Sequence, residues 1–197
     1  MRNKNFTHPQ NFTDERGHLW SMAALKNYLE RNRNNYNKVY NDIKDLVIKS
    51  ILSAEYIFTK ESRKKYYGKK VSTIIGYDIL IDENLKPWLL EMNCICPDLS
   101  PHDIVDEVIK PEVIKNYLNI IGLVPFSHKN NKPLDDVYEY KDKIEEMVDD
   151  SLCEFERSDG DLERIFPLKD NVDYYKKFFE SPGKENELLW EKLKDFD

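Results

Sequence analysis

The longest regular pattern of apolar positions lies between Asn37 and Phe58, where such residues recur every three or four positions. They are Val39, Ile43, Leu46, Val47, Ser50, Ile51, Ala54 and Phe58. This spacing predicts an amphipathic helix of about six turns. A shorter pattern of the same period predicts another helix over residues 19–31. Residues 1–17 contain a mix of Asn, Thr, Pro, Gln, Asp and Gly, and we expect a loop there.

A β-hairpin is predicted over residues 72–93, where two apolar runs flank the polar turn Asp82-Glu83-Asn84. The apolar residues of these runs do not alternate cleanly with polar ones, so we expect both faces of the sheet to be covered. Three polar residues interrupt the runs: Asp78, Glu91 and Asn93. A carboxylate buried in a strand is costly unless it is paired, hydrogen-bonded or bound to a cation.

The spacing of the two carboxylates indicates where they lie in the hairpin. Twelve residues separate Asp78 from Glu91, so any loop of even length places both side chains on the same face, with Asn93 two residues further along it. Oxygen ligands of this kind suit Mg²⁺, which completes its shell with water and phosphate oxygens. The alternative is that these residues simply face solvent and bind nothing.

Two more helices are expected after the hairpin. A helical pattern begins near Ile104 and closes at Gly122, a suitable C-terminal cap, and Pro111 within it predicts either a start or a kink at that point. From residue 133 to 197 there are 21 Asp and Glu against 10 Lys and Arg, a difference of −11. The best helical pattern of this acidic part is Val137–Phe155. We therefore expect an α+β chain with two parts, residues 1–132 and 133–197.

Composition excludes several classes of protein. The net charge of −7 argues against binding of nucleic acid by the whole chain. No apolar run approaches the roughly 18 residues of a membrane span, so no membrane partner is expected. Three cysteines without a signal segment favour a reduced, cytoplasmic protein. Cys94 and Cys96 resemble a metal-binding pair, but Cys153 is remote, and packing explains them better.

One basic stretch stands out in this acidic chain. Residues 60–70 hold six Lys and Arg against Glu61 alone, a local charge of +5. A run of like charges is usually a solvated loop. The functional interpretation is a docking segment for an acidic partner, and its candidate residues are Lys64, Lys65, Lys69 and Lys70.

The hairpin sequence from Gly76 to Asn93 closely resembles the ATP-grasp signature of the tubulin-tyrosine-ligase-like family, especially its glutamylase members. Residues 17–20 and 43–55 are similar to the helical stretch that precedes this hairpin in the family. Residues 162–167 and 174–180 are similar to the tail of the glutamylase branch. The resemblance therefore extends through most of the chain.

This resemblance implies a fold, cofactors and site residues. The chain would be the C-terminal portion of an ATP-grasp domain, followed by an acidic helical extension. Asp78, Glu91 and Asn93 would bind Mg²⁺ and ATP, and Glu91 would bridge two ions as the catalytic residue. In such ligases the phosphate-binding lysines and the adenine pocket lie earlier in the chain, and we find no glycine-rich phosphate loop here. The sequence is therefore expected to be the C-terminal portion of a longer enzyme or a truncated gene product. The turn after Asn93 differs from the family's Ser-Pro-Ser-Leu type, which leaves the acceptor side of the site open.

The implied activity is the ATP-dependent addition of glutamate to tubulin carboxylates through an acylphosphate. The partners would be free glutamate and the acidic tails of tubulin or microtubules, and the location would be the cytoskeleton, with cilium and centriole as candidates. Two alternatives remain: a ligase of the same fold that adds glycine or tyrosine, and a non-catalytic tubulin-binding module. The glutamylase-like residues 162–167 favour glutamate over the other amino acids.

Overall fold

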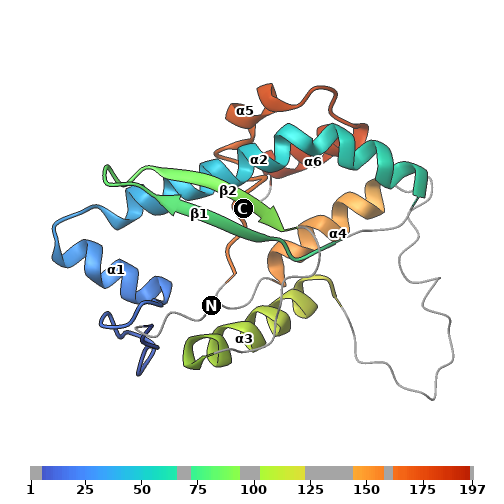
Figure 1. Ribbon diagram of the computed structural model, residues 1–197. Coiled ribbons are helices and arrows are strands. Elements are labelled where there is room, and N and C mark those ends of the chain that lie inside the picture. The colour runs from blue at the N-terminus through green and yellow to red at the C-terminus, as the bar shows by residue number, and fades with distance from the viewer. Residues whose placement is uncertain (1–5, 66–71, 94–102, 123–143, 158–161, 196–197) are drawn as a thin grey trace, which may run out of the picture. The chain divides into compact units, whose positions relative to one another are not determined.

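The computed structural model describes residues 6–65, 72–93, 103–122, 144–157 and 162–195. Its elements, labelled in Figure 1 except for the short 3-10 helix η2, are α1 (Met22–Arg31), α2 (Tyr36–Lys65), β1 (Gly76–Ile81), β2 (Pro87–Asn93), α3 (Ile104–Ile120), α4 (Ile144–Glu156), α5 (Val172–Tyr175), η2 (Lys176–Phe178) and α6 (Lys184–Asp195). The described part of the chain is α+β, as expected.

The structure divides into two compact units, which are described separately. The first contains the described residues up to Asp45 together with Ile74–Lys115, and so includes the hairpin. The second contains the described residues of Leu46–Thr73 and of Asn116–Asp197. The expected boundary between residues 132 and 133 lies outside the described residues and stays a prediction.

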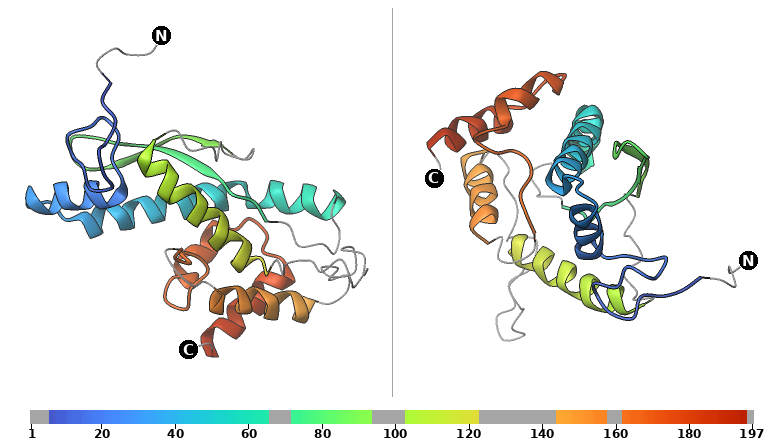
Figure 2. Two further views of the ribbon diagram at one scale, coloured as in Figure 1. Left: turned by 90° about the horizontal axis from the view of Figure 1, so that it is seen from below. Right: turned by 90° about the vertical axis from the view of Figure 1, so that its left-hand side faces the viewer.

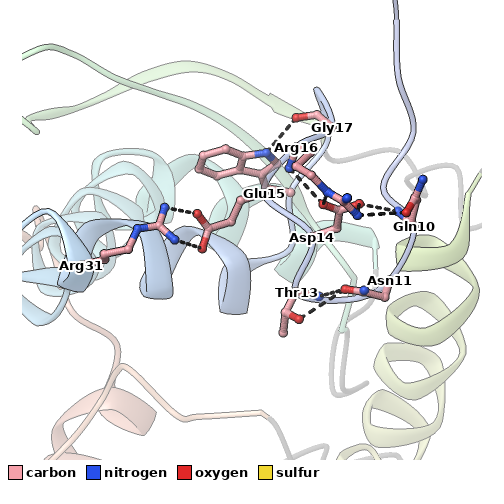
Figure 3. A network of polar contacts seen from close by, with 9 residues as sticks. Gln10, Asn11, Thr13, Asp14, Glu15, Arg16, Gly17 and Arg31 are labelled. Carbon is pink, nitrogen blue, oxygen red and sulfur yellow. Dashed lines mark hydrogen bonds and ion pairs between the residues drawn. The ribbon is translucent and has the colours of Figure 1, made fainter.

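The segment before α1, expected to be a loop, contains no helix or strand but is held by a polar network around Asp14 (Figure 3). The Asp14 carboxylate is 7% exposed and accepts hydrogen bonds from the backbone N–H groups of Gln10 at 2.9 Å and Arg16 at 3.0 Å. The Arg16 side chain adds a third hydrogen bond through Nε at 2.9 Å. These bonds, that of the Arg16 side chain first, hold the pKa of Asp14 well below its usual range. A buried carboxylate therefore fixes the turn that precedes the first helix.

Helix α2 confirms the strongest helical prediction and continues beyond it to Lys65 (Figure 2). The basic residues 60–65 are therefore helical, and their interpretation as a loop is wrong. Lys, Arg and Glu are good helix formers, and cations at a helix C-terminus interact favourably with its dipole. Lys64 and Lys65 end the helix, whereas Lys69 and Lys70 lie outside the described residues.

Helix α3 contains Pro111 but does not begin there. It begins at Ile104, and the Asp103 side chain caps it by accepting hydrogen bonds from the backbone N–H groups of Val105 at 2.8 Å and Asp106 at 3.0 Å. The turn that follows the helix contains Gly122, which has φ +70°, as expected for a glycine cap. The predicted helix 137–155 corresponds to α4, and residues 137–143 lie outside the described part.

The second unit has a small core built around Ile48 and Leu52 of α2 and Tyr175 of α5. Ile165, Phe166 and Phe179 pack against this core and are partly buried. Helices α4 and α6 pack on each other, and the residues that they bury are Val148, Leu152, Trp190 and Leu193. No helix within the described residues combines the length and the apolar character needed to cross a membrane.

Candidate metal site on the hairpin

The hairpin brings the three predicted residues together. β1 and β2 pair antiparallel, with Asp78 opposite Glu91 and Gly76 opposite Asn93. The carboxyl groups of Asp78 and Glu91 face each other across the two strands, and Asn93 Nδ2 donates a hydrogen bond to Glu91 Oε1 at 3.1 Å. The prediction that Asp78, Glu91 and Asn93 lie on one face of an antiparallel hairpin is therefore confirmed.

The route to this arrangement differs from the expected one. Ile81 pairs with Pro87, so the loop is residues 82–86, and a loop of five residues is odd rather than even. Asp78 pairs with Glu91 but Ile79 pairs with Leu89, which leaves Leu90 without a partner in the ladder. Leu90 is therefore a β-bulge, and its one extra residue restores the parity that the odd loop removes.

Burial explains why the bulge forms. One face of the hairpin carries Tyr77, Ile79, Ile81, Pro87 and Met92, which are buried or half-buried, and Leu89, which is 37% exposed. The other face carries the exposed side chains of Asp78, Leu80, Trp88, Glu91 and Asn93. Without the bulge, Met92 would turn outward and Glu91 and Asn93 would turn into the packed face. The bulge keeps both polar residues on the exposed face.

The exposed face corrects one expectation. Both faces of the sheet were expected to be covered, but Leu80 is 52% exposed and Trp88 is 48% exposed. Asp78, Glu91 and Asn93 on the same face are exposed as well. The carboxylates are consequently accessible and not buried.

The hairpin loop is organised by Asp82. Its Oδ1 accepts the backbone N–H groups of Asn84 at 2.9 Å and Lys86 at 3.0 Å, and its Oδ2 accepts the indole N–H of Trp88 at 2.8 Å. These bonds, that of Trp88 first, lower the pKa of Asp82. Leu85 adopts a left-handed conformation with φ 62° in the same loop. The Lys86 ammonium lies 3.8 Å from the centroid of the Trp88 ring. The loop is thus a defined support for the strand that carries Glu91.

The electrostatics of the pair suit a cation. The hydrogen bond with Glu91 raises the pKa of Asp78, and desolvation and the repulsion of the Glu91 charge add to this effect. The described residues contain no group of three or more His, Cys, Asp or Glu side chains that could hold a metal ion. A cation held here would therefore have two carboxylates and an amide as protein ligands. Such a hard oxygen set fits Mg²⁺, with water and phosphate oxygens in the remaining positions.

Sequence reasoning missed the roles of Leu90 and Asp82. The pattern that could have indicated Asp82 is an aspartate at the start of a hairpin loop, where its side chain accepts backbone N–H groups further on. No local pattern marks Leu90. The lysines proposed for docking an acidic partner belong to the end of α2 or lie outside the described residues.

The family model and the individual relatives that match this chain agree on one family. Residues 2–131 match the family described as "Tubulin-tyrosine ligase family". The tubulin monoglutamylase TTLL4 of Mus musculus is 40% identical over 127 residues, which are 62% of this chain and 10% of that protein. A probable alpha-tubulin polyglutamylase, Ttll1 of Tetrahymena thermophila, is 36% identical over 112 residues, or 56% of this chain and 25% of that protein.

A third relative extends the similarity into the C-terminal part. It is a probable beta-tubulin polyglutamylase of Tetrahymena thermophila, 27% identical over 184 residues that cover 80% of this chain and 15% of that protein. Across these three relatives, the matched part of the chain spans between 10% and 25% of the relative's length.

Proposed function

The chain belongs to the tubulin-tyrosine ligase family, and we propose that it serves an ATP- and Mg²⁺-dependent ligase activity that adds glutamate to carboxylates of tubulin. The observation that carries this proposal is the pairing of Asp78 and Glu91, with Asn93 beside them, on one exposed face of the hairpin. The names of the relatives, which are tubulin glutamylases, support the choice of tubulin and glutamate.

Such a ligase forms an amide in two steps. A carboxylate of tubulin receives the γ-phosphoryl group of ATP and becomes an acylphosphate, and the amine of free glutamate then displaces the phosphate. Phosphoryl transfer depends on positioning and on neutralisation of charge more than on covalent help from the protein. When bound, Mg²⁺ would supply that neutralisation at the ATP phosphates.

The residues of this chain would prepare the site for the cation. Asp78 and Glu91 would hold it, and the repulsion between their two charges makes a bare pair unfavourable at neutral pH, which favours a divalent ion between them. Asn93 orients the Glu91 carboxylate through its hydrogen bond at 3.1 Å. In this proposal Glu91 would be the catalytic residue that helps to hold the cation, and Asn93 would be a third ligand and a positioning group.

The proposal is tested by thermal unfolding of this chain with and without millimolar Mg²⁺. Binding to the folded state alone raises the melting temperature. We expect this rise in the wild type and in Glu83→Gln, which removes an exposed charge from the nearby loop. We expect it to disappear in Asp78→Asn and in Glu91→Gln. An equal rise in all four proteins would show that Mg²⁺ binds elsewhere and would overturn the assignment.

A second candidate is a non-catalytic module that binds tubulin in the cytoskeleton. It is the alternative that the sequence leaves open, and it is compatible with the same family match over residues 2–131. Microtubules incubated with ATP and labelled glutamate, glycine or tyrosine separate the candidates. Incorporation of glutamate supports the proposed ligase. Co-sedimentation without incorporation of any of the three supports the binding module.

A further inference from the structure

A short loop in the second unit presents a serine to solvent. Residues 179–183 contain no helix or strand and lead into α6 (Figure 1). At one end of the loop, the Phe179 ring packs against Trp190 of α6, with 5.0 Å between the ring centroids. At the other end, the Gly183 carbonyl accepts two backbone N–H groups of α6 at 3.0 Å and 3.2 Å. Both ends of the loop are therefore fixed, and Ser181 between them is exposed.

The backbone of this loop suits a reaction at the serine hydroxyl. Phe179 is extended, with φ −79° and ψ 130°, and Pro182 disfavours a helical conformation for the residue before it, Ser181. The Ser181 hydroxyl forms no hydrogen bond with any of the described residues. No contact of the described fold therefore has to break before this hydroxyl meets the active site of another enzyme.

The neighbours of Ser181 define the class of enzyme. Ser181 is followed directly by Pro182 and, three positions on, by Lys184, which is exposed. Because proline has no N–H group, it suits a kinase groove that is apolar at this position and offers no hydrogen-bond acceptor. The Lys184 ammonium can pair with an acidic group further along such a groove. Kinases that are directed by proline combine these two preferences.

The rest of the sequence offers one comparison. Ser100-Pro101 is the other Ser-Pro pair, and the sequence contains no Thr-Pro pair. The third position after Ser100 is Asp103, whose negative charge would repel an acidic group in the kinase groove. Ser100 and Pro101 lie outside the described residues, so this pair serves only as a control. Ser181 is thus the acceptor that meets both requirements.

Exposed serines and Ser-Pro pairs are common in loops, where they favour turns and need no modification. Here a loop with fixed ends, an exposed hydroxyl and both selecting neighbours coincide. We propose that Ser181 is the phosphorylation site of a proline-directed protein kinase. In this step, Ser181 Oγ attacks the γ-phosphorus of the kinase's ATP, the bond from that phosphorus to the bridging oxygen of ADP breaks, and the hydroxyl proton passes to the catalytic aspartate of the kinase. The inference does not depend on a ligase activity of this chain.

The phosphate would add charge without unfolding the second unit. It would carry about −1.5 to −2 charges at pH 7, two residues before Gly183 and the first turn of α6. The helix dipole favours a negative charge there, whereas the exposed Glu180 and Glu187 oppose it. Trp190 lies far along α6 and stays buried. We therefore expect phosphorylation of Ser181 to change the melting temperature by no more than about 2 °C.

The test incubates the full chain with a cyclin-dependent kinase, as the proline-directed probe, and ATP, and maps phosphate by mass spectrometry. We expect phosphate on Ser181 in the wild type and no label at this position in Ser181→Ala. Pro182→Ala and Lys184→Gln should each lower the initial rate at Ser181 about tenfold, because each removes one selected contact. Ser100→Ala and Lys194→Gln, which removes an exposed lysine of the same helix, should stay within about twofold of the wild type.

Absence of phosphate from Ser181 in the wild type, or wild-type rates in both Pro182→Ala and Lys184→Gln, would overturn the proposal. Equal labelling of Ser181 by the cyclic-AMP-dependent kinase, which selects basic residues before the acceptor, would also overturn it, since exposure alone would then explain the reaction. Melting curves accompany the rates because Pro182 is half-buried; if Pro182→Ala unfolds, Lys184→Gln at its exposed position decides alone. Labelling of Ser181 should be unchanged in Glu91→Gln, which separates this inference from a failure of the hairpin site.

Discussion

Three aspartates of the first unit show how the surroundings of one residue type decide its role. Asp14 accepts hydrogen bonds from two backbone N–H groups and from the Arg16 side chain, and its pKa falls. Asp82 accepts two backbone N–H groups and the indole of Trp88, and its pKa also falls. Asp78 faces Glu91 instead, and its pKa rises. The first two accept hydrogen bonds from donors within the chain, whereas the third faces a second carboxylate, which is the arrangement on which the proposed cation site rests.

The titration of Asp78 is the first prediction at the residue scale. Its folded-state pKa lies above the ordinary value of 3.8, so the folded protein holds the proton more tightly than the unfolded chain does. The resulting stabilisation is present below pH 3.8 and is lost as the pH rises through the folded-state pKa. Carboxyl ¹³C NMR should show the raised pKa, and Glu91→Gln should abolish the rise. Unchanged titration of Asp78 in that variant would contradict the coupling.

Mg²⁺ should oppose the protonation of Asp78, because the cation and the proton compete for the same carboxylate oxygens. We expect saturating Mg²⁺ to lower the apparent pKa of Asp78, and we expect the affinity for Mg²⁺ to increase with pH until that carboxyl is ionised. Ca²⁺ at the same concentration serves as a comparison that separates charge from coordination geometry. An affinity that stays constant across this pH range would argue against direct coordination by Asp78.

Among the elements, the hairpin shows most clearly what a bulge contributes. Three residues of β1 and four of β2 lie between the loop and the Asp78–Glu91 pair, and Leu90 is the surplus one. Deletion of Leu90 leaves three on each side, so we expect a regular ladder in which Asp78 still faces Glu91. The raised pKa of Asp78 and the stabilisation by Mg²⁺ should both persist. Nuclear Overhauser contacts across the strands and the Mg²⁺ melt measure this outcome.

Deletion of Ile79 is the matched control, since it shortens the chain by one residue at the same level of the ladder. It leaves two residues of β1 against four of β2, so Asp78 can face Glu91 only with a larger bulge or with loss of the loop that Asp82 organises. We expect the coupling between Asp78 and Glu91 to be lost. If both deletions behave alike, the register of the hairpin does not determine the site.

The elements also show how far the sequence alone leads. The helical period of residues 37–58 and the polar turn after Ile81 predict α2 and the hairpin, because repeated burial of one face leaves a regular pattern. The bulge at Leu90 leaves no such pattern in the sequence. It depends on Met92 packing against the covered face of the hairpin while Glu91 stays on the exposed face. The continuation of α2 to Lys65 was missed because a run of charges resembles a loop although its residues favour helix.

At the scale of the whole molecule, two helices each contribute to both units. Asp45 and Leu46 are neighbours within α2, and Lys115 and Asn116 are neighbours within α3, yet each pair is divided between the units. The hairpin with its carboxylates belongs to the first unit, and the core around Leu52 belongs to the second. Stability and chemistry can therefore be examined by separate substitutions.

Leu52→Ala tests the core of the second unit. Leu52 is 6% exposed and contacts the cluster of Ile48 and Tyr175, so its truncation should lower the free energy of unfolding by about 3 kcal/mol. Ile57→Ala, in the same helix but 62% exposed, should change it by no more than about 0.5 kcal/mol. Urea unfolding followed by circular dichroism measures both. Equal losses in the two variants would show that this cluster is not the stabilising core.

The last prediction separates catalysis from capture of tubulin in catalytically active enzyme. If Glu91 acts at the transferring phosphoryl group as proposed, Glu91→Gln should make incorporation of glutamate collapse while co-sedimentation with microtubules barely changes. Neutralising Lys64, Lys65, Lys69 and Lys70 should instead weaken co-sedimentation with microtubules and leave the chemical step largely intact. The expected reason is that long-range attraction to a glutamate-rich tail governs association and is screened by salt.

The two variants are assayed in parallel at two salt concentrations, by incorporation of labelled glutamate and by co-sedimentation with microtubules. Weaker co-sedimentation of the quadruple lysine variant, with a flatter salt dependence, would support docking by the end of α2 and the residues after it. Unchanged co-sedimentation of the quadruple variant would contradict that role of the lysines and leave the carboxylate pair on the hairpin as the remaining support for the proposed ligase.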